Sequence, residues 1–164
     1  MNSVCLAILN YNGRQHLEHL LPTAVAAAKK SPVACTVLVL DNRSTEPDLD
    51  WVRQNFPSVR TVVAPENDFL FSYNWLLAQL PDEVVVILNN DLRLDENFLA
   101  PLRRQCHAPD VFAVSASSFD WDGTERTIGP HIARGPPSPL LASTSIAYHC
   151  RLGMAECQNW TRTR

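Results

Sequence analysis

The sequence predicts an α/β fold with an open, mostly parallel sheet and helices on both faces. Short apolar runs rich in β-branched residues lack polar alternation, which is typical of strands covered on both sides. Segments of helical length separate these runs, and this alternation favours parallel strands joined by right-handed crossovers. The predicted strands occupy residues 4–9, 36–40, 59–63, 84–88 and 111–114.

Four helices are expected between and after these strands. Apolar residues recur at helical spacing in the first helix, where Pro22 is expected to kink the helix or shift its start. Residues 44–47 indicate a cap with proline in the first turn, and Asp95 is expected to cap the last helix. The helices are predicted over residues 17–28, 49–56, 73–80 and 95–106.

The composition indicates one compact domain. The chain has 164 residues, 46% of them apolar, which is enough for a single core. Its net charge of −3 argues against nucleic acid as the main partner, because nucleic-acid-binding proteins usually carry a basic excess. The sequence has no run of ~18 apolar residues and no amino-terminal signal peptide. We therefore expect a soluble, cytoplasmic protein.

The charge changes sign near Gly129. Residues 1–128 hold 10 Lys or Arg and 16 Asp or Glu, whereas residues 129–164 hold four Arg and one Glu. The second segment also contains four of the twelve prolines and shows neither a helical nor a strand period. We expect an α/β domain over 1–129 and an atypical tail over 130–164, either disordered or a remnant of a longer fold.

Several common motifs are missing from the sequence. Gly13 stands alone after the first predicted strand, so there is neither a dinucleotide-binding fingerprint nor a P-loop. The sequence also has no Gly-x-Ser-x-Gly elbow. The five cysteines are odd in number and lack paired short spacing, which argues against a disulfide framework and a structural zinc.

Three of the predicted strands end in polar clusters, at residues 10–12, 41–44 and 89–91. Open α/β sheets bind ligands outside the carboxyl ends of their strands, so these clusters predict a binding site at one edge. Asp91 is the natural ligand for a divalent cation, Mg²⁺ or Mn²⁺, with Asn89 as a weaker oxygen donor. The alternative, that residues 89–91 only terminate a strand, stays open on spacing alone.

Four motifs, in the same order and spacing, resemble the amino-terminal half of family 2 glycosyltransferases, and the rhamnosyltransferase-like branch is nearest. They are residues 9–13 (Leu-Asn-Tyr-Asn-Gly), 39–46, 66–69 with Asn74, and 88–91 (Leu-Asn-Asn-Asp). The similarity covers residues 3–129. It implies a truncated GT-A fold, the α/β fold of nucleotide-diphospho-sugar transferases, with residues 1–129 as the nucleotide-sugar-binding domain.

The resemblance implies a role for residues in each motif. The first-strand motif would contact the nucleotide base through Asn10, Tyr11 and Asn12. The pair after the second strand, Asp41 and Asn42, would bind base and ribose. The nucleotide sugar would be surrounded by Asn67, Asn74 and Asn90. The metal motif Asp-x-Asp is matched by Asn89 at its first position and Asp91 at its last.

The chain departs from the family pattern at a few of these positions. Asn89 replaces the first acidic residue of the metal motif. Asp68 stands where the family usually has glycine, and Phe71 and Ser72 replace smaller residues. These differences lie where the sugar would be received.

The implied activity is transfer of a sugar from a UDP- or dTDP-linked donor to an acceptor glycan or lipid-linked saccharide. A divalent cation would stabilise the leaving nucleoside diphosphate, and inverting members also need a carboxylate base. Nothing in this chain matches the family's acidic acceptor segment, so the catalytic base is unassigned. The alternatives are a catalytically incomplete nucleotide-sugar-binding fragment and a doubly wound interaction module without a ligand. Peripheral association with the inner face of a membrane stays open.

Overall fold

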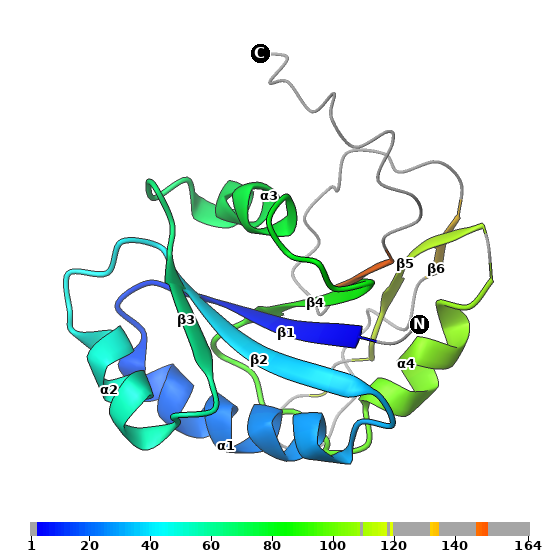
Figure 1. The fold of residues 1–164 in the computed structure, drawn as a ribbon, viewed down its shortest axis with the longest axis horizontal. Helices are drawn as coiled ribbons and strands as arrows, with labels where there is room; N and C mark the ends of the chain where they lie inside the picture. The colour runs from blue at the N-terminus through cyan, green and yellow to red at the C-terminus, as the bar shows by residue number, and fades with distance from the viewer. Residues whose placement is uncertain (1–2, 109, 118, 120–131, 135–146, 151–164) are drawn as a thin grey trace, which may run out of the picture.

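The computed structural model describes residues 3–108, 110–117, 119, 132–134 and 147–150. Within these residues one seven-stranded sheet has the order β3-β2-β1-β4-β7-β5-β6 (Figure 1). Its strands are β1 (Ser3–Asn10), β2 (Ala34–Asp41), β3 (Arg60–Val63), β4 (Val84–Asn89), β5 (Val111–Ser115), β6 (Ile132–Arg134) and β7 (Ala147–Cys150).

Helices cover both faces of this sheet, as predicted. They are α1 (Arg14–Lys30), α2 (Asp48–Asn55), α3 (Ser72–Leu77) and α4 (Leu99–Gln105), with a 3₁₀ turn η1 (Phe69–Phe71) before α3. Figure 1 shows α1, α2 and α4 on one side of the strands and α3 on the other. None of the helices in the described part of the chain is long and apolar enough to cross a membrane.

The residues of β1 show how the two faces divide the core. Val4, Leu6 and Ile8 pack in one buried cluster with the apolar residues of α1, α2 and α4. The alternate residues Cys5 and Ala7 belong to a second cluster that includes α3. Successive strand residues point to opposite faces, so a fully apolar strand needs cover on both sides. The prediction from the uninterrupted apolar runs, that both faces of the strands are covered, is therefore confirmed.

The parallel part of the sheet fixes which loops meet. β1 pairs in parallel with β2 and with β4, and β2 pairs in parallel with β3. Asn10 lies opposite Asp41, and Leu9 lies opposite Asn89. The carboxyl ends of these strands therefore share one edge, hereafter called the carboxyl edge.

The sheet continues beyond β4 with antiparallel pairs. β7 pairs with both β4 and β5, and β6 pairs with β5. The sequence did not predict β6 and β7, since strands of three and four residues are too short to show alternation. Most of residues 130–164 lie outside the described part, and the domain boundary at residue 129 stays a prediction.

Two predicted helix caps were wrong. α2 begins at Asp48 with Pro47 before it and without a side-chain cap, because the Ser44 side chain is hydrogen-bonded to Asp41 and Asn12 instead. α4 begins at Leu99, and Asp95 instead accepts a hydrogen bond from the Asn97 backbone N–H, 2.8 Å away. Pro22 lies inside α1, which starts at Arg14.

Two cysteines lie in the central strands, Cys5 buried in β1 and Cys35 half-buried in β2. Burial raises the pKa of Cys5 to about 11 and that of Cys35 to about 12. Desolvation penalises the thiolate, so both side chains stay neutral at physiological pH.

Tyr73 ties α3 to the centre of the sheet. Its hydroxyl donates to the Leu88 carbonyl of β4 at 2.7 Å and lies 3.2 Å from the Ala7 carbonyl of β1. The ring is buried, and this burial raises the pKa of the Tyr73 phenol above its ordinary value. The group therefore remains a hydrogen-bond donor at any physiological pH.

We predict that Tyr73→Phe lowers the free energy of unfolding by about 1 kcal/mol, the usual net worth of one buried hydrogen bond. Urea unfolding should show a lower midpoint with an unchanged slope. The matched control is Tyr11→Phe, which removes the same hydroxyl from a half-exposed ring. Equal midpoints for the two variants would contradict the role given to Tyr73.

Candidate functional site

Asn10 joins the loops at the carboxyl edge. Its side chain is fully buried, and its Nδ2 donates to Asp48 Oδ2 at 2.8 Å. The same nitrogen lies 3.4 Å from Asp41 Oδ1 and from Ser44 Oγ. Its Oδ1 accepts a hydrogen bond from Asn90 Nδ2 at 3.0 Å. One amide therefore connects the segments that follow β1, β2 and β4, and its side chain has no surface left for a ligand.

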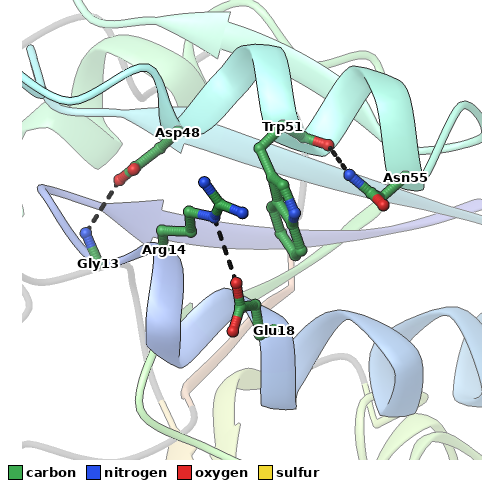
Figure 2. A network of polar contacts seen from close by, with 6 residues as sticks. All are labelled: Gly13, Arg14, Glu18, Asp48, Trp51 and Asn55. Carbon is green, nitrogen blue, oxygen red and sulfur yellow. Dashed lines mark hydrogen bonds and ion pairs between the residues drawn. The ribbon is translucent and has the colours of Figure 1, made fainter.

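Asp48 is a residue of this edge that the sequence analysis missed. The carboxylate is buried at the start of α2 and accepts from Asn10 Nδ2 and from the Gly13 backbone N–H, 3.0 Å away (Figure 2). A carboxylate at a helix amino terminus is also favoured by the helix dipole. The available signal was an acidic residue directly after Pro47, in the first helical turn.

Asp41 and Asn12 hold the loops after β1 and β2 together. The buried Asp41 carboxylate accepts from the Ser44 backbone N–H at 3.0 Å and from the Ser44 hydroxyl. Asn12 Oδ1 accepts from the backbone N–H of Thr45 at 2.8 Å and of Glu46 at 3.3 Å. Both predicted site residues therefore also shape the loops that carry them.

Asn42 connects the loops after β2 and β3. It is buried, and its Nδ2 donates to Asn67 Oδ1 at 2.7 Å and to the Phe69 carbonyl at 3.3 Å. Its Oδ1 accepts from the Ser72 hydroxyl. Next to it, the Arg43 guanidinium donates to the Pro65 carbonyl, with the closer contact at 2.6 Å. The structure thus uses the Asn42 side chain internally.

The remaining predicted residues are accessible from solvent. Tyr11 is half-exposed, and Asn90, which contacts Asn10, is half-buried. The exposed set also includes Asn12, Asn67, Asn74, Asn89 and Asp91. The predicted site residues therefore divide into a buried group that fixes the loops and an exposed group that a ligand can reach.

Backbone strain is concentrated at the same edge. Within the described residues, three non-glycine residues have positive φ: Asn12 at 47°, Arg43 at 65° and Phe69 at 51°. They follow β1, β2 and β3 respectively. Asn tolerates this conformation, but for Arg and Phe it costs about 1–3 kcal/mol, which the surrounding contacts must offset. Strain of this kind is typical of functional loops.

Gly13 is required by close packing at the start of α1. A Cβ atom placed there would lie 2.1 Å from Asn90 Nδ2 and 2.7 Å from Asn10 Oδ1. No side chain fits at these distances without displacing the Asn10–Asn90 hydrogen bond. The lone glycine after the first strand therefore allows two loops to approach each other.

A polar depression of about 370 Å³ lies beside the carboxyl edge, between the starts of α1 and α2. In Figure 2 the Arg14 side chain extends between Glu18 and Trp51. Its Nε is 3.2 Å from Glu18 Oε1, and its guanidinium lies 5.2 Å from the Trp51 ring centroid. The depression is lined by Asn12, Arg14, Gln15, Glu18, Glu46, Pro47 and Asp48.

The candidate metal residues offer a partial set of ligands. Asn89 ends β4 and Asp91 follows it, both exposed at the carboxyl edge. No group of three His, Cys, Asp or Glu side chains suited to a metal is found among the residues that the structure describes. One carboxylate with an amide oxygen fits Mg²⁺ or Mn²⁺ where phosphate oxygens of a ligand complete the coordination.

The sequence matches no protein-family model and no curated protein. The structure is similar to mannosyltransferase PcManGT from Pyrobaculum calidifontis in complex with GDP-Man and Mn²⁺, with 24% identity and a TM-score of 0.61 over 69% of this chain and 34% of that one. It is also similar to residues 1–349 of S. aureus TarS in complex with UDP-GlcNAc, with 19% identity and a TM-score of 0.55 over 69% of this chain and 33% of that one.

These similarities confirm the predicted fold class. The sheet order β3-β2-β1-β4 with its covering helices is the amino-terminal half of the GT-A fold. The chain spans about a third of the length of the solved structures that it matches. The described residues therefore have the amino-terminal half of the GT-A fold, and open α/β sheets bind ligands at the carboxyl ends of their strands.

Proposed function

We propose that this chain is the donor-binding part of a family 2 glycosyltransferase of hexosyl or rhamnosyl type. It would bind a nucleoside diphosphate sugar and serve its transfer to an acceptor. The observation that carries the proposal is the Asn10 network, which fixes the loops after β1, β2 and β4 against one another. Such preorganisation lowers the entropic cost of binding a ligand across several loops.

The exposed residues suit the parts of such a donor. The Tyr11 ring is available for stacking with the nucleotide base. The amides of Asn67 and Asn74 offer donors and acceptors for ribose and sugar hydroxyls. Asn10, Asp41 and Asn42 would act by holding these loops in place. The matched structures, with bound GDP-Man or UDP-GlcNAc, support a nucleotide sugar as the ligand.

A divalent cation fits the same proposal. Asp91, with Asn89, would hold Mg²⁺ or Mn²⁺, and the bound ion would stabilise negative charge on the leaving nucleoside diphosphate. The residues of the chain orient the donor, while the base that activates the acceptor is unassigned. The acceptor would be a glycan or a lipid-linked saccharide. Because a lipid-linked saccharide lies at a membrane surface, the proposal includes peripheral association with a membrane.

Two other functions remain as alternatives. A nucleotide-sugar-binding fragment would bind the donor without transferring the sugar, which suits a chain that covers about a third of the length of the matched structures. An interaction module would bind no nucleotide at all. Measurements of nucleotide binding and of donor hydrolysis separate the three functions.

We predict that the chain binds UDP or dTDP and that Tyr11→Ala weakens this binding about tenfold or more, since base stacking is worth about 1–3 kcal/mol. Isothermal titration calorimetry measures the affinity. The matched control is Tyr11→Phe, which keeps the ring and should bind as the wild type does. No heat with UDP, dTDP or GDP at millimolar concentration would leave only the interaction module.

The cation gives a second prediction. Mn²⁺ should strengthen the binding of UDP-GlcNAc or GDP-mannose by the wild type, and Asp91→Asn should abolish this dependence, because one ligand charge is lost. Asp95→Asn is the matched control, since it neutralises an exposed carboxylate in the following turn. An Mn²⁺ effect that survives in Asp91→Asn would place the cation elsewhere.

Transfer is separated from binding by donor hydrolysis. A wild-type rate above that of Asp91→Ala would support a working transferase. Equal rates at background level, with donor binding intact, would support the binding fragment.

The packing at Gly13 gives a prediction about the organisation of the edge. Gly13→Ala should lower the free energy of unfolding by about 1–3 kcal/mol, the usual cost of overpacking. Because the added methyl group meets Asn90 first, Gly13→Ala should cost less in an Asn90→Ala background. Urea unfolding of the four proteins of this double-mutant cycle measures the coupling. Strictly additive effects would show that Asn90 does not restrict this position.

A further inference from the structure

The turn η1 exposes two large aromatic side chains. Phe69 is 73% exposed and Phe71 is 66% exposed, although most large apolar residues of the described chain are buried. Exposed aromatic side chains of this size mark a candidate binding surface when other observations point to a ligand. Two further observations, the conformation of the turn and the groups around it, bear on what binds there.

The turn is held in an unfavourable conformation by named contacts. Phe69 has a φ of 51°, which bulky residues rarely adopt. Its backbone N–H donates to Asn67 Oδ1, and its carbonyl accepts from Nδ2 of the buried Asn42, both at 3.3 Å. The Phe71 backbone N–H donates to the Asp68 carbonyl at 3.0 Å. The backbone that carries the two side chains is therefore held from the carboxyl edge of the sheet.

The surroundings of the two rings are polar. Asn67 precedes the turn and Asn74 lies in the first turn of α3, and both are exposed. β3, which leads into this loop, ends opposite Asp41 at the carboxyl edge. A loop that carries exposed aromatic rings together with amide donors and acceptors matches a pyranose, which has an apolar C–H face and a rim of hydroxyls.

The exposed area favours a small ligand over a protein partner. Two aromatic side chains exposed to this extent present about 300 Å² of surface, on a scale of 150–250 Å² each. A stable protein interface buries roughly 800 Å² per partner. A single sugar ring has the size of the surface that these residues offer.

We propose that Phe69 and Phe71, with the amides of Asn67 and Asn74, form a saccharide-binding site for the apolar face of a pyranose ring. The proposal rests on the proposed function in placing a sugar at this edge. The same chemistry occurs in the sugar of the donor and in an acceptor sugar. Asn42 is then a positioning residue, which acts by holding the Phe69 turn.

Saturation-transfer NMR with methyl glycosides of mannose, N-acetylglucosamine and rhamnose tests the site without any nucleotide. The wild type should transfer saturation to ring C–H protons of at least one glycoside. Phe69→Ser and Phe71→Ser should weaken the binding about five- to tenfold, whereas Phe69→Tyr, which keeps an aromatic ring, should retain it. Phe119→Ser is the matched control, since Phe119 is 60% exposed and follows β5, which four strands separate from β3 in the sheet.

Calorimetry with UDP, GDP, UDP-GlcNAc and GDP-mannose identifies the source of the sugar. A loss in Phe69→Ser for the nucleotide sugars, with UDP and GDP unchanged, would assign the site to the donor sugar. Loss of glycoside binding alone would assign it to the acceptor sugar. Both results support the proposal.

Three results would overturn it. The first is an equal loss of UDP and UDP-GlcNAc binding in Phe69→Ser, which would mean that the ring stacks on the base. The second is unchanged binding of every sugar by both serine variants. The third is no binding of any sugar by the wild type. Nucleotide binding without sugar binding would remove this site and leave the proposed function standing. Glycoside binding through Phe69 without nucleotide binding would keep this site and remove the proposed function.

Discussion

The carboxyl edge of this sheet depends on one buried side chain, the amide of Asn10. A buried polar group is costly unless its hydrogen bonds are made, and this amide makes them with groups from three different segments. That requirement places Asp48 and Asn90 against Asn10. It also explains the glycine at position 13, because Gly13 must approach Asn10 and Asn90 more closely than any side chain allows. The exposed residues of the site are thus carried on loops whose positions the interior of the protein sets.

Much of the fold followed from the sequence. The uninterrupted apolar runs predicted strands covered on both faces, and the parallel order of β3, β2, β1 and β4 agrees with them. The helix starts were less predictable. Ser44 was expected to cap a helix, but its hydroxyl is hydrogen-bonded to Asp41, and a sequence does not show which of two acceptable partners a hydroxyl will choose. β6 and β7 were missed because strands this short carry no usable period.

The convergence of polar side chains at the carboxyl edge was predictable from the sequence, whereas the burial of each side chain was not. The polar residues after β1, β2 and β4 do come together, as parallel neighbours must. Residue type does not reveal burial, however, and Asn10 and Asn42 proved to be buried while Tyr11 and Asp91 are accessible. Asp48 was overlooked because an acidic residue in a first helical turn is ordinary, and only its burial against Asn10 and Gly13 distinguishes it.

The position of β7 has a consequence for the order in which the sheet assembles. β7 lies between β4 and β5, although α4, β5 and β6 separate it from β4 along the chain. The four parallel strands all lie between Ser3 and Asn89 in the chain. The outer edge of β4 is paired only once residues 147–150 have been synthesised, since β5 reaches the sheet through β7. Both halves depend on long-range pairing, Val4 with Val84 in the parallel half and Val84 with Cys150 in the antiparallel half, and the candidate metal residues Asn89 and Asp91 stand where the two halves meet.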